Sequence, residues 1–577
     1  VVWNLDDLYP GPASPAFHED EKRCRTLAEE LDQKYSGRVG ELGAKEVCAL
    51  VSSLEDLAVI IGKLSTYAFL NFTTRTKDEA AAALLQRVRE LASEVGKHTV
   101  FFELEWNQID AERARRLLAD PALDRYRHYL ADLRKYAPHQ LSREKEELLI
   151  EIAPAGRASW TNLFEKVMGH MEFGEGRRTE EEVLADLYSP DRETRRRAAG
   201  ELTAGLREQL HVLTHIFNTL LTDKMIDDRL RGYATWLDQM NLANELRNET
   251  VETLVRAVTG RYDIVQRYYR LKRRLLGLDE LYDYDRYAPL PNLPERQVGW
   301  EEAREMVLGA MREFSPRMAE VAERFFTDKW IHAPILAGKR GGAFAHPCVP
   351  DAHPYVMLNY TGNLRDISTL AHELGHGVHQ FLAADQGYFN SSTPLVLAET
   401  ASVFAELLLF RHQLALLDNK AERRAFVAQK LESIFATVFR QIAMNRFEDA
   451  VHNERRRQGE LSSERISGMW LETQEAMFAE SVTLTEDYGV WWAYIPHFLA
   501  TPGYVYSYAF GELLVLALYN LYLDDPQGFV PRYLDLLAAG GSASPYELVA
   551  SFGVDLNDAS FWQGGLRVID DMLRQIE

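Results

Sequence analysis

Cysteine is scarce in this chain, and apolar runs of membrane-spanning length are missing. The 577 residues include only three cysteines, which are too few and too scattered for a disulfide framework. No apolar stretch approaches the length of a transmembrane helix. The first residues are acidic and lack the apolar core of a signal peptide. These absences predict a protein that works in the reducing environment of the cytoplasm.

Positive charge is also in short supply. Asp and Glu number 87 against 65 Lys and Arg, which gives a formal net charge of −22. Nucleic acids and anionic membrane surfaces attract basic proteins, so this balance argues against either of them as a partner. The net charge favours solubility and leaves the substrate open, because the local field at a cleft can differ from the total.

Strand-like alternation is rare as well, and most of the chain shows the 3.6-residue periodicity of helices. In the N-terminal part this pattern covers residues 15–35, 44–72, 76–106 and 110–135. We expect these segments to form antiparallel helix hairpins. A cap and a proline at Ser189-Pro190 open a new helical block. The predicted fold class is mainly α, with an N-terminal helical lobe over residues 1–189 and a second lobe over residues 190–577.

One stretch, from residue 332 to residue 362, departs from this helical pattern. It is rich in glycine at first, and the segment from Pro354 to Tyr360 then alternates and contains β-favouring residues. We therefore expect a small β-sheet at this point of the chain.

The most informative pattern, His-Glu-x-x-His, follows directly after that predicted sheet. Residues four apart stack on one face of a helix, so His372 and His376 can bind one metal ion. Glu373 is one step round the helix, where it can take a proton from a water in the metal's open position. An apolar stripe and a predicted N-cap at Asn363 support the helix. The pattern indicates a zinc hydrolase, and the alternative is a polar helix face with two surface histidines.

A catalytic zinc site usually has three protein ligands, so a third ligand is needed. Downstream, Thr393 as N-cap and Pro394 at the first helical position predict a second helix. This helix is nearly all apolar or small apart from Glu399 and Glu406, which are seven residues apart on one face. A buried carboxylate needs a charged partner, so we predict that Glu399 is the third ligand. For Glu406 two predictions stay open: it fixes the tautomer of a histidine ligand, or it forms an ordinary ion pair.

A second chemically dense stretch, rich in Trp and Tyr, lies late in the chain. Amide hydrolysis on zinc builds an oxyanion, which needs a hydrogen-bond donor aimed at it. The hydroxyls of Tyr504 and Tyr508 and the N–H of His497 suit that role. A helix starting after Pro502-Gly503 would place the two tyrosines on one face and Tyr506 elsewhere. The alternative is an aromatic stretch that only packs in the core.

The loop before the predicted strand holds His346, Cys348, Asp351 and His353. Taken alone, this is a metal-like cluster, but its spacing matches no common site and two prolines stiffen it. We favour a loop that lines a cleft over a second, structural metal site.

Several of these strings together resemble the oligoendopeptidase F family, which belongs with the thimet-oligopeptidase-like zinc peptidases. The resemblance covers essentially the whole chain, and its central motifs are specific. It is carried by Trp3 to Pro10, Arg231-Gly232-Tyr233, Gly341-Gly342-Ala343-Phe344, Pro354 to Gly362, Leu364-Arg365-Asp366, His372 to His376 and Glu399 to Glu406.

The resemblance implies a multi-lobed helical ellipsoid with a deep central channel and a small β-sheet next to the metal helix. It implies one zinc ion per chain on the channel wall, in the catalytic lobe of residues 190–577. The family pairs this zinc site with a His and Tyr residues from a late loop and helix, which fall here on His497, Tyr504 and Tyr508. Among Tyr504, Tyr506 and Tyr508, the residue that stabilises the oxyanion stays open.

We therefore predict a zinc-dependent endopeptidase that hydrolyses internal bonds of short, unstructured peptides, with Glu373 as general base. One alternative is a metallocarboxypeptidase of similar helical-cleft fold, which would need a cationic group for the C-terminal carboxylate of its substrate. Another is a peptide-binding scaffold with a vestigial site, against which the intact Glu373 argues. The sequence leaves open cleavage specificity, a monomeric or homodimeric state, and Co²⁺ or Mn²⁺ in place of zinc.

Overall fold

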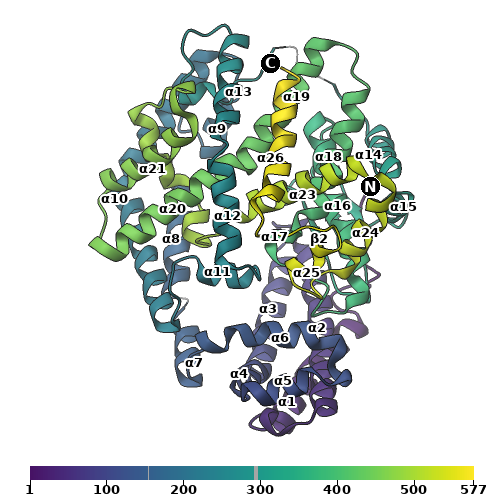
Figure 1. The fold of residues 1–577 in the computed structure, drawn as a ribbon. Helices are drawn as coiled ribbons and strands as arrows, with labels where there is room; N and C mark the ends of the chain where they lie inside the picture. Colours follow the sequence, from purple (N-terminus) through teal and green to yellow (C-terminus); the bar gives the residue numbers. More distant parts are fainter. Residues whose placement is uncertain (154, 292–295) are drawn as a thin grey trace. The chain divides into compact units, whose positions relative to one another are not determined.

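The computed structural model describes residues 1–153, 155–291 and 296–577 of the chain. It is mainly α-helical, and the described residues form one small sheet of three strands (Figure 1). This confirms the predicted fold class. Each described helix is either too short or too polar to cross a lipid bilayer.

The chain folds into two compact units, each assembled from three separate stretches. Unit 1 comprises Val1–Gln140, Glu295–Gln413 and Leu521–Val554, and unit 2 comprises Leu141–Pro294, Leu414–Asn520 and Asp555–Glu577. These units are defined by tertiary packing, which joins stretches that are far apart in the sequence. The predicted boundary near residue 190 is defined by a local helix-start signal at Ser189-Pro190. The division into lobes of residues 1–189 and 190–577 stays a prediction.

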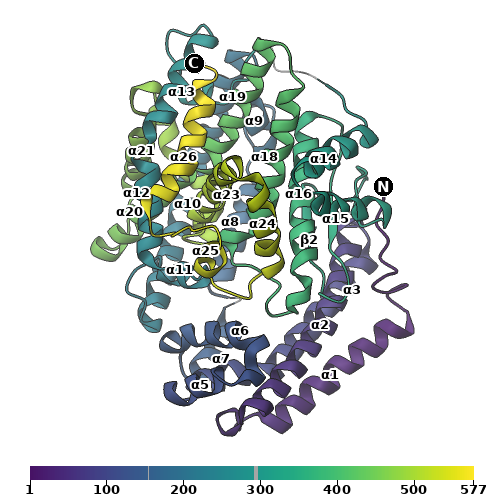
Figure 2. The same ribbon diagram turned by 45° about the vertical axis from the view of Figure 1, so that its right-hand side comes forward.

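In unit 1 the predicted segments 15–35 and 44–72 are single helices, whereas 76–106 is divided into two helices and 110–135 into two helices joined by a 3₁₀ segment. Ser14 caps the first helix by accepting a hydrogen bond from the N–H of Phe17, with Pro15 at the first helical position. The first three helices pack side by side (Figures 1 and 2). The helices of this part are α1 (Pro15–Tyr35), α2 (Ala44–Thr73), α3 (Glu79–Thr99), α4 (Phe101–Gln108), α5 (Ala111–Leu118) and α6 (Arg127–Leu133).

The remaining elements of unit 1 surround the segment with the His-Glu-x-x-His pattern. Their bounds are α14 (Trp300–Phe314), α15 (Pro316–Thr327), β1 (Ile331–His332), β2 (Phe344–His346), β3 (Tyr355–Met357), α16 (Leu364–Ala383), α17 (Leu395–Ala398), α18 (Thr400–Ala415), α24 (Pro526–Ala539) and α25 (Pro545–Ala550). The sheet has the order β1-β3-β2, with β1 parallel and β2 antiparallel to β3. Strand β2 is therefore an edge strand, and both β2 and β3 pack against α16, as predicted for the sheet.

Helix α16 carries the predicted motif and forms for the predicted reasons. The side chain of Asn363 accepts a hydrogen bond from the N–H of Asp366 at 2.9 Å, which caps the first turn. The apolar stripe at helical spacing is fully buried and includes Ile367, Leu370, Leu374 and Val378.

The segment after α16 corrects one prediction. We expected an uninterrupted helix with Thr393 as N-cap and Pro394 in its first turn. The helix begins one residue later, with Pro394 at the cap position and no side-chain cap hydrogen bond, and it stops at Ala398. Glu399 lies at this break, with φ −82° and ψ 0°, and α18 begins after it. The break separates Glu399 from the regular face of α18 on which Glu406 lies.

Unit 2 is built mainly from helices and includes short 3₁₀ segments. Helix α10 is the longest of them, with 40 residues. The bounds are α7 (Arg143–Ile152), α8 (Arg157–His170), α9 (Glu180–Asp186), α10 (Arg192–Arg231), α11 (Asp238–Ala243), α12 (Asn248–Thr259), α13 (Tyr262–Leu275), η4 (Asp283–Asp285), α19 (Lys420–Thr437), α20 (Phe439–Gln458), α21 (Ser463–Phe478), η7 (Glu486–Tyr494), α22 (His497–Ala500), α23 (Tyr506–Asp524) and α26 (Ala559–Arg574).

The close approach of α16 to α18 generates a stability prediction. A Cβ on Gly375 would lie 2.5 Å from the carbonyl oxygen of Ala401 and 2.6 Å from the Cα of Ser402, both of which are backbone atoms. Gly375→Ala is therefore expected to lower the free energy of unfolding by about 1–3 kcal/mol through overpacking. Chemical denaturation of the full-length chain measures the change.

Gly200→Ala in α10 is the matched control, since a Cβ there meets nothing within 4 Å. It is expected to raise the stability slightly, by about 0.4–1 kcal/mol, because alanine restricts the unfolded chain. Equal effects of the two substitutions would contradict the assigned role of Gly375.

Candidate functional site

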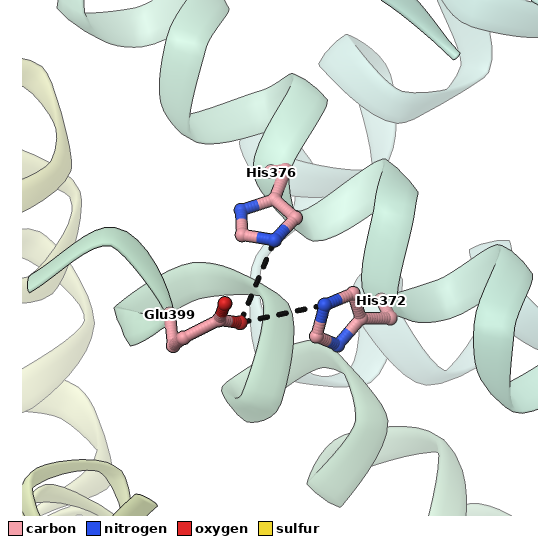
Figure 3. A group of neighbouring side chains, drawn as sticks. All are labelled: His372, His376 and Glu399. Carbon is pink, nitrogen blue, oxygen red and sulfur yellow. Dashed lines mark ion pairs between the residues drawn. The ribbon is translucent and has the colours of Figure 1, made fainter. Parts of the chain in front are cut away.

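Three side chains of unit 1 converge on one point. Nε2 of His372 lies 3.3 Å and Nε2 of His376 3.5 Å from the same carboxylate oxygen, Oε2 of Glu399. The two imidazoles come from adjacent turns of α16, and Glu399 reaches them from the break before α18 (Figure 3). Among the described residues, these three form the group of His, Cys, Asp and Glu side chains able to hold a metal ion. Two imidazoles and one carboxylate are a donor set typical of catalytic zinc.

Glu406, for which the sequence leaves two predictions open, contacts the first of these histidines. Its Oε1 lies 2.6 Å from Nδ1 of His372, and its Oε2 accepts a hydrogen bond from the hydroxyl of Ser368 at 3.2 Å. A proton on Nδ1 leaves the lone pair of Nε2 free to bind a metal. Burial lowers the pKa of His372, but the hydrogen bond and charge of Glu406, together with Glu399 and Glu373, raise it to about 9. The surrounding carboxylates thus favour a positive charge at this point.

The other two candidate ligands are also held by neighbours. The hydroxyl of Ser402 donates a hydrogen bond to Oε2 of Glu399 at 2.6 Å. The backbone of Ala398 accepts a hydrogen bond from His376, whose pKa burial lowers to about 4, so this imidazole is neutral at neutral pH. A neutral imidazole is the form that binds a metal. The break at Glu399 therefore supplies both a candidate ligand and, through Ala398, an orienting contact for a second one.

Glu373, the predicted base, is 7% exposed and lies beside the edge strand. Burial raises the pKa of this carboxyl to about 7, while a hydrogen bond from the backbone N–H of Ala345 in β2 acts in the opposite direction. A carboxylate with a pKa near the working pH is suited to accept a proton and then release it. The small sheet thus contacts the predicted base directly.

A pocket of about 910 Å³ opens next to His376 within unit 1. Its walls come from α2 and α3, the loop between β2 and β3, α16 and the segment that leads to α17. The lining includes Phe69, Val88, Cys348, His379 and Tyr388. A half-apolar hollow of this size beside a metal site can accept a side chain of a bound peptide.

The histidine-rich loop that lines this pocket is held by protein contacts. Nδ1 of His346 accepts a hydrogen bond from the N–H of Cys348 at 3.0 Å. His353 stacks on Trp330 with ring centroids 4.2 Å apart and lies 3.2 Å from the carboxylate of Asp7. In the described part of the chain, these residues form no metal-binding group. The preferred interpretation, a loop that lines a cleft, is supported by the pocket.

The predicted oxyanion residues form a cluster of their own in unit 2. Nε2 of His497 lies 3.2 Å from the hydroxyl of Tyr508, and the rings of Tyr504 and Tyr508 are 4.8 Å apart and perpendicular. All three side chains are partly exposed. Burial lowers the pKa of His497, so its imidazole is neutral at neutral pH. The sequence predicted His497 in a loop, but it opens the short helix α22.

Tyr506 lies apart from these three residues. It is fully buried, and its hydroxyl accepts a hydrogen bond from the side chain of Asn244 at 2.9 Å. The turn before it is anchored by Glu448 in α20, which accepts a hydrogen bond from the N–H of Gly503 at 2.8 Å. Burial raises the pKa of Glu448 to about 8, so the carboxyl is largely protonated at neutral pH. Helix α23 starts at Tyr506, later than predicted, and Tyr504 lies in the preceding turn.

Sequence reasoning missed the contacts that orient the candidate ligands. Ser368 lies four positions before His372, and Ser402 lies three positions after Glu399. Serine is common on helices, so neither residue gives a specific signal. Ala345 acts through its backbone N–H, to which its side chain gives no clue. A contact of that kind can be found only when the strand is placed against the helix.

Comparisons with known proteins agree with this geometry. A sequence model described as peptidase family M3 matches residues 186–568, and one described as oligopeptidase F matches residues 105–173. Oligopeptidase PepF of Bacillus subtilis is 25% identical over all of this chain and 87% of its own length. Group B oligopeptidase PepB of Streptococcus agalactiae is 26% identical over all of this chain and 96% of its own.

Solved structures share the fold. Oligoendopeptidase F from Enterococcus faecium superposes with a TM-score of 0.73 at 23% identity, over 97% of this chain and 98% of its own. PZ peptidase A superposes with a TM-score of 0.78 at 16% identity, over all of both chains. The match to the family model covers well over half of the sequence, including every candidate site residue. The protein therefore belongs to peptidase family M3 and is a metalloendopeptidase.

Proposed function

We propose that the protein is a zinc-dependent oligoendopeptidase that cleaves internal bonds of short, unstructured peptides. The observation that carries the proposal is the convergence of His372, His376 and Glu399 next to the buried Glu373. Members of family M3 are zinc metallopeptidases, and the relatives described above are named as oligopeptidases. One zinc ion per chain fits the two imidazoles and one carboxylate.

The proposed mechanism assigns a task to each side chain. When bound, zinc supplies Lewis-acid chemistry and lowers the pKa of a bound water toward about 7. His372, His376 and Glu399 are the residues that would hold it. Glu373 takes a proton from the attacking water and passes it to the leaving amine. Its pKa of about 7 suits both transfers.

The oxyanion is stabilised by a hydroxyl from unit 2 in this proposal. Tyr508 is the preferred donor, because its hydroxyl is paired with the neutral imidazole of His497 and its ring packs on Tyr504. His497 and Tyr504 would orient Tyr508 or donate in its place. Tyr506 is not a candidate, because its buried hydroxyl is bound to Asn244.

The edge strand β2 is the proposed place for the substrate backbone. Its free edge offers N–H and C=O groups to an extended peptide, which gives affinity that does not depend on side chains. Strand β2 also contacts Glu373 through Ala345, so a bound peptide would lie beside the base. The pocket next to His376 would then receive one substrate side chain.

Two predictions about surroundings belong to the same proposal. The enzyme is expected to work in the cytoplasm, and the free state of Cys24, Cys48 and Cys348 is consistent with a reducing compartment. Its partners are expected to be short peptides. The predictions of no nucleic acid and no membrane partner rest on the net charge of −22.

Peptide cleavage under control of the metal tests the function. A quenched peptide of about ten residues is expected to be cut at internal bonds, with loss of activity on chelation and recovery with zinc. Mass spectrometry of the products identifies the cut bonds. A ladder of single residues lost from the C-terminus would instead support the metallocarboxypeptidase alternative. Zinc binding and peptide affinity without turnover would support a binding scaffold.

The role of the base is tested by Glu373→Gln. This change removes the proton acceptor and is expected to lower kcat by about 10²- to 10⁴-fold. Zinc content should stay at one equivalent, because the amide leaves His372, His376 and Glu399 in place. A variant that keeps its zinc and cleaves at the wild-type rate would show that another group is the base.

Glu406 is expected to tune metal affinity. Glu406→Gln weakens the hydrogen bond to Nδ1 of His372, and zinc affinity should fall by about 10- to 100-fold in competition with a chelating dye. Glu313→Gln is the matched control, because Glu313 contacts Nδ1 of His412 at 3.0 Å outside the candidate metal group. If both variants bind zinc equally well, Glu406 has no part in metal binding.

Tyr508→Phe removes the proposed oxyanion donor. The expected result is a fall in kcat of about 100- to 1000-fold with little change in KM, since the hydroxyl acts on charge that develops during the reaction. Tyr506→Phe is the control and should lower stability rather than kcat, because its hydroxyl is buried on Asn244. Steady-state kinetics with one peptide separates the two. An unchanged kcat in Tyr508→Phe would transfer the role to Tyr504 or His497.

A further inference from the structure

Two arginines in unit 2 contact aromatic residues and have no carboxylate partner. Arg286, directly after η4, is 4% exposed, and its guanidinium lies 4.8–5.1 Å from the ring centroids of Tyr287, Phe478 and Tyr488. Arg440 of α20 donates a hydrogen bond to the hydroxyl of Tyr494 at 3.5 Å. In the described part of the chain, no carboxylate lies within 4.0 Å of either guanidinium, although most other buried charges are paired.

Both guanidiniums also retain N–H groups without an acceptor. The Nη2 of Arg286 and the Nε of Arg440 are buried, and neither has a hydrogen-bond partner among the described atoms. The Nε of Arg286 is satisfied by the carbonyl of Asp283 at 2.9 Å. A buried donor without an acceptor is costly, and a charged one more so. The remaining donors therefore call for an acceptor that the protein itself does not supply.

The carboxylates of this region are already engaged. Asp285 pairs with Arg192 at 2.7 Å and with Arg195 at 2.8 Å, and Glu432 pairs with Lys272. Asp283 accepts two hydrogen bonds from Thr485, one from its N–H at 2.7 Å and one from its hydroxyl at 2.6 Å. Even with Asp283 counted against Arg286 and Arg440, this pair keeps one positive charge, and Asp285, which is shared by Arg192 and Arg195, cannot balance it.

One tyrosine beside the pair, Tyr287, responds to this positive charge. Burial raises the pKa of Tyr287, but the charges of Arg440 and Arg286 outweigh burial, and the pKa falls below its ordinary value. Tyr287, Arg440 and Tyr494 are partly exposed, whereas Arg286 is buried. Phenol hydroxyls and guanidinium N–H groups are all donors to an anion.

We propose that Arg440 and Arg286, with the hydroxyls of Tyr494 and Tyr287, form a binding site for one small monovalent anion. The anion is either a free halide or carboxylate, or the terminal carboxylate of a peptide. One surplus positive charge matches one negative charge. Tyr494 ends η7, three residues before His497, so an anion at this site would stabilise the segment that leads to the candidate oxyanion cluster. Only the peptide form of the proposal rests on the proposed peptidase function.

Chloride binding to the zinc-loaded full-length chain is the first test. The ³⁵Cl NMR line of sodium chloride is expected to broaden with the wild-type protein, and much less with Arg440→Gln. Zinc contributes equally to the line width with either protein, so the difference between the two line widths reports only the site at Arg440. Losing a hydrogen bond to a charged group should weaken chloride binding by roughly 10- to 100-fold. Arg440→Lys, which keeps the charge, is expected to recover part of the broadening.

Arg465→Gln is the matched control, because Arg465 is paired with Glu454 at 3.2 Å and leaves no charge over. It should broaden the line as the wild type does. Thermal unfolding gives a second readout: chloride at constant ionic strength, with the divalent anion sulfate as the replaced ion, should raise the midpoint saturably in the wild type and in Arg465→Gln, but not in Arg440→Gln. Equal broadening in wild type and Arg440→Gln, or no response to chloride, would overturn the site.

A kinetic comparison separates the two sources of the anion. One peptide is used with a free C-terminus and with a C-terminal amide. If the peptide carboxylate occupies the site, chloride raises KM for the free acid only, and Arg440→Gln removes the preference for the acid. If a free anion occupies it, chloride changes the kinetics of both peptides alike. A different outcome would contradict the proposal: the wild type binds no chloride but absorbs at 295 nm near neutral pH, and Tyr287→Phe loses this absorbance. The negative charge that balances the two arginines would then be the tyrosinate of Tyr287.

Discussion

The close contact between α16 and α18 is the constraint on which the metal site depends. Gly375 lets the two backbones approach to a distance that no Cβ would permit. At this distance the carboxylates of Glu399 and Glu406 reach the imidazole of His372 from two sides. A longer separation would leave two half-buried carboxylates without partners, which is energetically costly. The glycine inside the motif is therefore as necessary to the site's geometry as the ligands beside it.

Electrostatics within unit 1 follow from the same packing. The carboxylates of Glu399, Glu406 and Glu373 together raise the pKa of His372, whereas burial lowers that of His376. The cluster thus has an excess of negative charge that a divalent cation would balance. Glu373 is different, because burial holds its carboxyl near pKa 7 while strand β2 supplies a single N–H. Ligand and base are carboxylates of the same type, and their surroundings assign them different tasks.

Unit 2 contains buried groups with the opposite excess of charge, which is positive. Asp285 and Glu432 neutralise nearby cations, whereas Arg286 lies against three aromatic rings and Arg440 against the hydroxyl of Tyr494. The face of an aromatic ring attracts the positive charge of a guanidinium. It does not provide an oxygen acceptor for the N–H groups, which stay free to bind another acceptor. Such an arrangement accommodates the two arginines without a carboxylate and leaves their charge for the proposed anion. The aromatic richness that the sequence shows in this region thus has a role beyond packing.

The sequence by itself determined what depends on near neighbours in the chain. The caps at Ser14 and Asn363, the buried stripe of α16 and the i, i+4 pair of histidines follow from local pattern, because helix geometry fixes which residues share a face. Family membership also follows from the sequence, through motifs spread along the whole chain. The ellipsoidal outline and channel that the resemblance implies stay predictions.

Tertiary structure alone decided the contacts between distant segments. The break at Glu399, the N–H of Ala345 at Glu373 and the separation of Tyr506 from Tyr508 all depend on how one element packs on another. So does the pairing of Arg440 with Tyr494, and so do two compact units that each join three separated stretches. Local periodicity specifies which face of a helix is apolar, but not which backbone or side chain that face will meet. That choice is made by the shape and charge of surfaces that exist only once the chain has folded.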